Sequence, residues 1–197
     1  MCDFTIVSIL LAAASVAITL AAVAIGVAIL TNAGFFTAGG SPAAMITAGI
    51  STAAAVGSLI AASVAATDFF NCILASNAGA AACAGQFSNF SNNISAMITT
   101  LSIQATACFA TAGIAWIPWA AQAPMWVIVG SLAVQSALIP SLTVFFNDLR
   151  KCINVAAASE VIPWWPNIFL VVAAIVVIAV TIYAGAKGGV FSRFNKG

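Results

Sequence analysis

Charged side chains are scarce in this 197-residue chain, and histidine is absent. Asp, Glu, Lys and Arg together supply 5% of the residues, whereas a soluble domain carries about 25%. So few charges cannot keep a surface of this size in water, which excludes a water-soluble globular protein. The lack of histidine removes the commonest general base and the usual axial ligand of haem. The net charge of +1 argues against nucleic acid as a partner, because phosphate binding needs clustered Lys and Arg.

Long stretches without any charge give the expected fold. Residues 4–67, 69–147 and 161–186 contain no Asp, Glu, Lys or Arg, and 63% of the chain is hydrophobic. A helix needs about 20 apolar residues to cross hydrocarbon about 30 Å thick. The sequence therefore predicts an all-α, polytopic transmembrane bundle that forms a single membrane domain over residues 1–197. The expected spans are 4–31, 42–67, 94–115, 124–146 and 167–186.

The connections between these spans define the expected topology. External loops are predicted over 68–93 and 147–166, with Asn93 capping the third span. The tail 187–197 holds Lys187, Arg193 and Lys196 without an acidic residue, so the positive-inside rule places the C-terminus in the cytoplasm. The first span is expected to be retained, because it is longer than a signal-peptide core and lacks a basic start.

Aromatic residues with a polar edge lie close to the predicted span ends. Such rings prefer the headgroup level of a bilayer, so they are interpreted as interface anchors and not as a ligand cage. The predicted anchors are Trp116, Trp119, Trp126, Trp164, Trp165 and Tyr183.

Four of the five cysteines fall on the predicted external side, where thiols oxidise readily. The favoured disulfide joins Cys72 to Cys83 across the expected external loop, which would leave Cys152 to meet Cys2 or stay free. The alternative interpretation is that these cysteines are reduced, small apolar residues. No metal is predicted, because the chain has neither histidine nor a C-x-x-C pair.

The spans lack ionisable residues and carry neutral polar ones. The absence of buried acids and bases argues against proton pumps, voltage sensors and covalent catalysis, so no catalytic residue is predicted. Gln104 and Gln135 are the strongest polar candidates, either as hydrogen-bonding links between helices or as the lining of a narrow pore. A helix-packing face is predicted on the second span from small residues at every fourth position, namely Gly49, Ala53, Gly57, Ala61 and Ala65.

A weak internal repeat suggests that a helical hairpin has been duplicated, with one C-terminal span added. Val56-Gly57-Ser58-Leu59 recurs as Val129-Gly130-Ser131-Leu132, and Phe69-Phe70-Asn71 recurs as Phe145-Phe146-Asn147. Both matches fall on even-numbered spans, as a parallel repeat requires. Compositional bias can also produce such matches.

Three functions remain open from the sequence, none of them enzymatic. The leading hypothesis is a structural or accessory subunit that packs into a larger membrane assembly, with the lipid bilayer and other subunits or copies of itself as partners. The second is a pore for small neutral solutes, including a holin-like permeabilising protein. The third is an accessory subunit that binds pigment, quinone or lipid. No cofactor is predicted, although bound lipids are expected.

Overall fold

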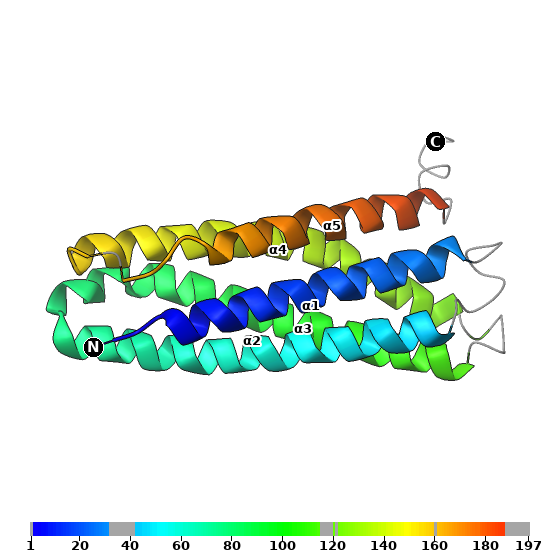
Figure 1. The fold of residues 1–197 in the computed structure, drawn as a ribbon, viewed down its shortest axis with the longest axis horizontal. Coiled ribbons are helices and arrows are strands. Elements are labelled where there is room, and N and C mark those ends of the chain that lie inside the picture. The colour runs from blue at the N-terminus through cyan, green and yellow to red at the C-terminus, as the bar shows by residue number, and fades with distance from the viewer. Residues whose placement is uncertain (1, 32–41, 115–119, 121, 160, 188–197) are drawn as a thin grey trace.

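The computed structural model describes residues 2–31, 42–114, 120, 122–159 and 161–187, and within these ranges the chain is an all-α bundle without β-strands (Figure 1). It contains five helices that are long and apolar enough to cross a membrane, which makes it a multi-pass membrane protein. The helices are α1 (Thr5–Leu30), α2 (Pro42–Ser76), α3 (Ala84–Ile114), α4 (Gln122–Ala156) and α5 (Pro166–Lys187), and a short 3-10 helix, η1 (Ala78–Cys83), joins α2 to α3.

The five helices form a closed ring in which each packs against the next and α5 returns to α1. The contact between α5 and α1 is close enough that a Cβ atom added at Gly26 would lie 3.5 Å from Val180 Cγ2. Lys187 Nζ donates to the Ile29 carbonyl at 2.5 Å, so the end of α5 also satisfies a carbonyl at the end of α1. This hydrogen bond joins the C-terminal ends of α1 and α5, which are distant in sequence.

Helices α1 and α5 have the predicted bounds, but α2, α3 and α4 are longer than predicted. The expected external loops 68–93 and 147–166 are wrong for most of their length: α2 continues to Ser76, α3 starts at Ala84, and α4 continues to Ala156. The prediction stopped each helix at the first charged or strongly polar residue. The helices continue because the apolar residues keep a helical spacing, as in Phe146, Leu149 and Ile153, which are all buried.

The extra length projects from one end of the bundle. At 1.5 Å per residue, the 35 residues of α2 and of α4 extend about 52 Å, and the 22 residues of α5 about 33 Å. Hydrocarbon is about 30 Å thick, so only α5 matches a single crossing closely. The ends of α2 and α4, together with η1 and the start of α3, form what is called below the stapled end, on the left in Figure 1.

Four phenylalanines fill the core near the stapled end. Phe4, Phe69, Phe90 and Phe146 come from the start of α1, from α2, from α3 and from α4, and each is at most 5% exposed. The ring centroids of Phe4 and Phe69 lie 4.8 Å apart in an edge-to-face contact, and Phe146 lies 6.2 Å from Phe4 and 6.3 Å from Phe90. These rings tie four helices together at the level where charged residues begin.

Asparagine and aspartate side chains hold the turns of the stapled end. Asn77 Oδ1 accepts from the Gly79 N–H at 3.0 Å and starts η1, while Asn77 Nδ2 donates to the Ala156 carbonyl at 2.7 Å. Asn154 binds both the N–H and the carbonyl of Ile162, at 2.9 and 3.1 Å, and fixes the segment before α5. Asp3 accepts from the hydroxyl and the N–H of Thr5, and these bonds lower the pKa of its carboxyl from the ordinary value.

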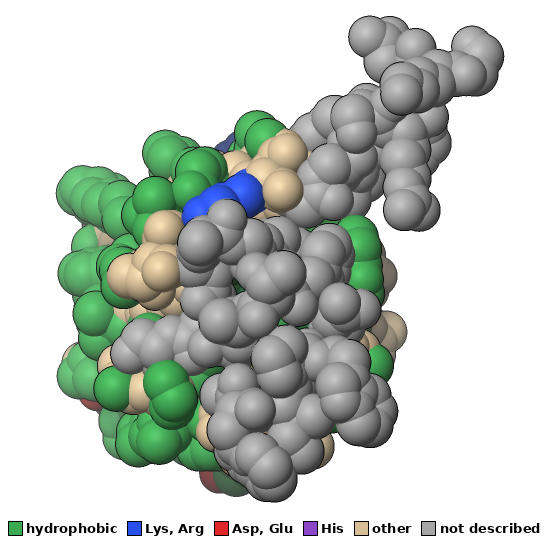
Figure 2. Space-filling model, turned by 90° about the vertical axis from the view of Figure 1, so that its right-hand side faces the viewer, with side chains coloured by type: hydrophobic (Ala, Val, Ile, Leu, Met, Phe, Trp, Pro, Cys, Tyr) green, Lys and Arg blue, Asp and Glu red, His purple; other side chains and the backbone are tan. Residues whose placement is uncertain are grey.

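The opposite end of the bundle has a different surface. Seen from that side, the described side chains are mostly hydrophobic around one small basic patch (Figure 2). Lys187, at the end of α5, belongs to this end of the described chain.

Candidate functional site

Neutral polar residues lie inside the bundle on the core-facing side of four helices. In α3, for example, Gln104 and Thr111 share a buried face with Leu101 and Cys108. The described buried polar residues are Ser8, Ser15, Thr52, Asn93, Gln104, Thr111, Ser131 and Gln135. Asn93, predicted as a helix cap, is instead a buried residue inside α3.

Gln104 and Gln135, both predicted from the sequence, are in direct contact at the centre of this group. Gln135 Nε2 donates to Gln104 Oε1, and Gln104 Nε2 donates to Thr52 Oγ1 at 3.3 Å. The Thr52 hydroxyl in turn donates to the Ala48 carbonyl at 2.7 Å. The two amides and Thr52 form a hydrogen-bonded chain across α4, α3 and α2, and all three residues are at most 1% exposed.

Some of the remaining polar groups in the core have hydrogen-bond partners, and others have none among the described residues. The hydroxyls of Ser15, Thr111 and Ser131 donate to carbonyls of their own helices at 2.7–2.9 Å. Four buried side-chain atoms have no hydrogen-bond partner among the described residues: Ser8 Oγ, Asn93 Oδ1 and Gln135 Oε1 inside the bundle, and Asn167 Oδ1 at the start of α5. The cluster holds no acid or base, so it can link helices or bind a neutral hydrogen-bonding molecule, but it cannot transfer a proton by a side chain.

Replacing one glutamine of the pair should destabilise the bundle. Gln104→Leu leaves the Gln135 amide without its acceptor in an apolar core, which is expected to cost about 1–3 kcal/mol of unfolding free energy. The double variant Gln104→Leu/Gln135→Leu should cost less than the sum of the two single changes, because no amide is left unpaired. Unfolding in mixed detergent micelles measures these energies.

The matched control for this cycle is Gln86→Leu, which changes a half-buried glutamine at the stapled end that makes no hydrogen bond with described residues. A loss of stability at Gln86 as large as that at Gln104, or strictly additive single losses, would contradict the role of the glutamine pair.

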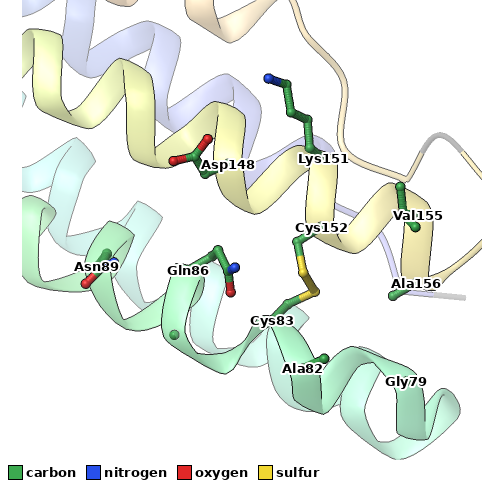
Figure 3. A pocket seen from close by; sticks show the side chains of 11 residues that line it. Gly79, Ala82, Cys83, Gln86, Asn89, Asp148, Lys151, Cys152, Val155 and Ala156 are labelled. Atoms are coloured by element: carbon green, nitrogen blue, oxygen red, sulfur yellow. A yellow bond between two sulfur atoms is a disulfide. The ribbon is translucent and has the colours of Figure 1, made fainter.

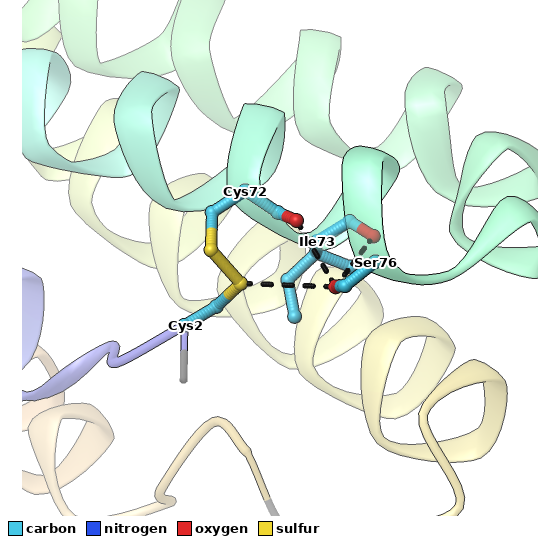
Figure 4. Close-up of a disulfide and its surroundings, with 4 residues drawn as sticks. All are labelled: Cys2, Cys72, Ile73 and Ser76. Carbon is cyan, nitrogen blue, oxygen red and sulfur yellow. Dashed lines mark hydrogen bonds between the residues drawn. A yellow bond between two sulfur atoms is a disulfide. The ribbon is translucent and has the colours of Figure 1, made fainter.

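The predicted disulfide between Cys72 and Cys83 is wrong. Cys72 pairs with Cys2, with a Cα–Cα distance of 5.7 Å, and Cys83 pairs with Cys152 at 5.8 Å. Figure 4 shows the first disulfide, with Ser76 Oγ 3.8 Å from Cys2 Sγ. Cys72 and Cys83 do not pair because Cys72 faces the N-terminal segment before α1, whereas Cys83 faces the end of α4. Cys108 is free and buried.

A polar groove of about 830 Å³ lies over the second disulfide, between the start of α3 and the end of α4 (Figure 3). Its polar lining includes Gln86 and Asn89 from one side and Asp148 and Lys151 from the other. The sequence prediction missed this site, because it treated both segments as loops. One signal in the sequence could have revealed it. Asp148 and Lys151 are three residues apart and alternate with apolar residues at helical spacing, which indicates that the helix continues past Phe146.

The predicted helix-packing face of α2 is not buried inside the bundle. Only Gly49 is buried; Ala65 is half-buried, and Ala53, Gly57 and Ala61 are exposed. The buried face of α2 carries larger residues such as Met45, Leu59 and Phe69. Spacing alone shows that small residues share a face, but not which neighbour that face meets. Contact of this face with another subunit or copy stays a prediction.

Two glycines on α2 give a matched test of this arrangement. A Cβ atom at Gly49 would lie 2.9 Å from the Phe109 ring, whereas at Gly57 nothing lies within 4 Å. Gly57→Ala should raise stability by about 0.5–1 kcal/mol as a better helix former, whereas Gly49→Ala should gain less, because the 44% exposed Phe109 ring must first turn away. Thermal unfolding in detergent measures both. A loss at Gly57 would show that its face is occupied.

The predicted interface anchors lie at helix ends where the structure describes them. Trp126 is 44% exposed in the second turn of α4, and Trp164 is 57% exposed just before α5. Trp165 stacks edge-on against Phe169 at 6.0 Å, and Tyr183 lies one turn from the end of α5. Trp116 and Trp119 fall outside the described residues.

Two apolar grooves mark the outer surface of the spans. One of about 420 Å³ lies between α3 and α4 and includes Ile103, Thr106 and Pro124. The other, of about 290 Å³, lies between α1 and α5 beside Leu20 and Phe169. Bound lipids at such grooves stay a prediction. In the described part of the chain, no three His, Cys, Asp or Glu side chains gather as a metal site.

Even-numbered helices α2 and α4 share features that the internal repeat predicts. Each contains 35 residues, Leu59 and Leu132 are buried, and Gly57 and Gly130 are exposed. Duplication of a helical hairpin nevertheless stays a prediction, since two amphipathic helices of one bundle share this pattern without common ancestry.

Comparison of the chain with protein-family models, with curated proteins and with solved structures finds no match.

Proposed function

We propose that this chain is a non-catalytic structural subunit of a membrane assembly. The observation that carries the proposal is the buried chain of hydrogen bonds from Gln135 through Gln104 to Thr52. The strongest polar groups of the spans are directed at one another and join three helices. A transport path instead needs polar groups that face an open passage. A closed ring of helices that are linked in this way offers other subunits a fixed surface to pack against.

Purification from the native membrane, in a mild detergent, tests this proposal. A structural subunit is expected to elute at a fixed stoichiometry with other subunits or with copies of itself. Removing the chain should then reduce the amount of assembled complex without changing the chemistry of the remaining subunits. Solute flux through the purified chain alone, in liposomes, would overturn the proposal.

A pore for small neutral solutes is the second candidate, and one observation favours it. Ser8 Oγ, Asn93 Oδ1 and Gln135 Oε1 are buried without a partner among the described residues, and water inside the bundle would supply the missing hydrogen bonds. A pore predicts glycerol or urea flux in liposomes that Gln135→Leu abolishes. Equal flux in empty liposomes and in liposomes with the protein would remove this candidate.

We also propose that the stapled end lies outside the cytoplasm and the C-terminus inside. Both disulfides lie at the stapled end, and disulfides persist in oxidising compartments. Helix α5 ends at the opposite end of the bundle, and the sequence from Lys187 onward holds basic residues without acidic ones, which the positive-inside rule assigns to the cytoplasm. Cysteine placed at exposed Ser159 should react with an impermeant maleimide in intact cells, and cysteine placed at Asn195 should not. The reverse pattern would invert the topology.

A further inference from the structure

The outer surface of the bundle differs sharply between its helices. The outer faces of α1 and α5 are hydrophobic, with Leu20 55% and Ile175 62% exposed, as expected of surfaces in contact with lipid tails. The outer face of α3 instead combines a row of neutral polar side chains with the exposed Ile103 and Phe109. The exposed polar residues of α3 are Ser88, Asn89, Asn92, Ser95, Thr99, Ser102 and Thr106.

One line of this row lies beside α4. Asn89, Asn92, Thr99 and Thr106 are separated by three or seven residues, so they share one side of α3. Asn89 lines the polar groove next to α4, and Thr106 lines the apolar groove next to α4, at the two ends of the line. The line therefore runs along the outer seam between α3 and α4.

The hydroxyls of this line are satisfied within α3, but the amides are not. Thr99 Oγ1 donates to the Ser95 carbonyl at 3.1 Å, and Thr106 Oγ1 to the Ser102 carbonyl at 3.0 Å. The threonines can therefore meet an apolar neighbour at low cost. The side-chain amides of Asn89 and Asn92 make no hydrogen bond with any described residue, and each amide has both donors and acceptors to offer.

Two opposite charges complete this surface at the stapled end. Asp148 and Lys151 are exposed one turn apart on α4, and both line the groove that contains Asn89. Their side chains extend in different directions, and neither forms an ion pair with a described residue (Figure 3). This gives the surface one acid, one base and no net charge.

We propose that this surface, the α3–α4 face, is the contact between two copies of the chain, related by a twofold axis along the membrane normal. The face consists of Asn89, Asn92, Thr99 and Thr106 on α3 with Asp148 and Lys151 on α4. In such a dimer, both copies contribute the same surface to the contact. Asp148 of each copy then faces Lys151 of the other, and the asparagine amides pair across the axis.

Self-complementarity favours a second copy over a different protein. A foreign partner would need its own matched acid, base and amides, whereas a copy supplies all of them by symmetry. The inference rests on the proposed structural role and names the partner for one surface.

Cysteine cross-linking locates the contact. In a Cys108→Ala background, Thr99→Cys on the α3–α4 face and Ile175→Cys on the outer face of α5 are compared in native membranes with a short bismaleimide. A dimer band is expected from position 99 and none from position 175. A dimer band from both positions, or from 175 alone, would overturn the proposed surface.

A charge exchange tests the chemistry of the contact in the full-length protein. Asp148→Lys places like charges across the axis and should weaken dimerisation about tenfold, because repulsion replaces two exposed ion pairs. The double exchange Asp148→Lys/Lys151→Asp should restore the wild-type dissociation constant. Counting photobleaching steps of the labelled protein in liposomes of decreasing protein density measures the dissociation constant.

The outcomes separate this inference from the proposed function. A protein that is monomeric at every density, or a double exchange that fails to restore dimerisation, overturns the twofold contact. If Thr99→Cys cross-links instead to a different subunit that elutes at fixed stoichiometry, the inference fails while the structural role stands. Solute flux through the chain alone overturns the structural role.

Discussion

Replacing Cys83 and Cys152 together by alanine is expected to lower the free energy of unfolding by about 2–4 kcal/mol. The disulfide joins residues separated by 69 positions, and closing a loop of this length removes much of the conformational freedom of the unfolded chain. It also fixes the end of α4 to the end of η1 at the stapled end. The Cys2–Cys72 disulfide, with a separation of 70, should have an effect of similar size.

Thermal unfolding in detergent, with and without a reductant, measures this loss. Cys108→Ala is the control, because it removes a free cysteine without opening a disulfide. The pairing itself is tested by Cys72→Ala, which should release the thiol of Cys2 to alkylation and leave Cys83 protected. Alkylation of Cys83 in that variant would contradict the observed connectivity.

Phe146→Ala is expected to cost about 3–5 kcal/mol, the range for removing a buried aromatic ring. Phe146 is fully buried and lies between Phe4 and Phe90, so the variant opens a cavity among three helices. This cluster lies at the level where charged residues begin, and lipid tails cannot readily fill the cavity there. Phe146→Leu keeps most of the volume and should cost much less.

The control for this prediction is Phe169→Ala, which removes the same ring from a side chain that is 39% exposed on α5. Its edge-on contact with Trp165 limits the expected loss to about 1 kcal/mol. Unfolding free energies of the three variants in the same detergent give the comparison. Equal losses at Phe146 and Phe169 would show that the phenylalanine cluster does not hold the helices together.

The five spans were predictable because partition into hydrocarbon depends on local composition. Thr5–Leu30 and Pro166–Lys187 match their predicted bounds closely, since turn residues or charges adjoin uninterrupted apolar runs. The predicted spans for α2 and α4 were too short, because Asp68 and Asp148 end the charge-free stretches of the sequence. A charge ends a lipid-facing stretch, but it does not end a helix that continues into water with a buried apolar face.

The candidate site was predictable only as separate residues. Gln104 and Gln135 stood out as polar groups in apolar spans, whereas their contact depends on the rotation of α3 and α4 about their axes. Thr52 was not distinguishable from the many other hydroxyls of the spans. Asn93 was expected at a helix end, and the early start of α3 placed it in the core instead.

The sequence by itself determined that this is an all-α membrane protein with five helices long and apolar enough to cross a bilayer. This property depends on composition over some twenty residues, which is the length that the bilayer imposes. Only the tertiary structure decided that Cys2 meets Cys72, that α5 returns to α1, and that Ala53 and Gly57 face outward. These properties depend on how helices distant in sequence rotate and pack, and a regular spacing leaves that rotation open.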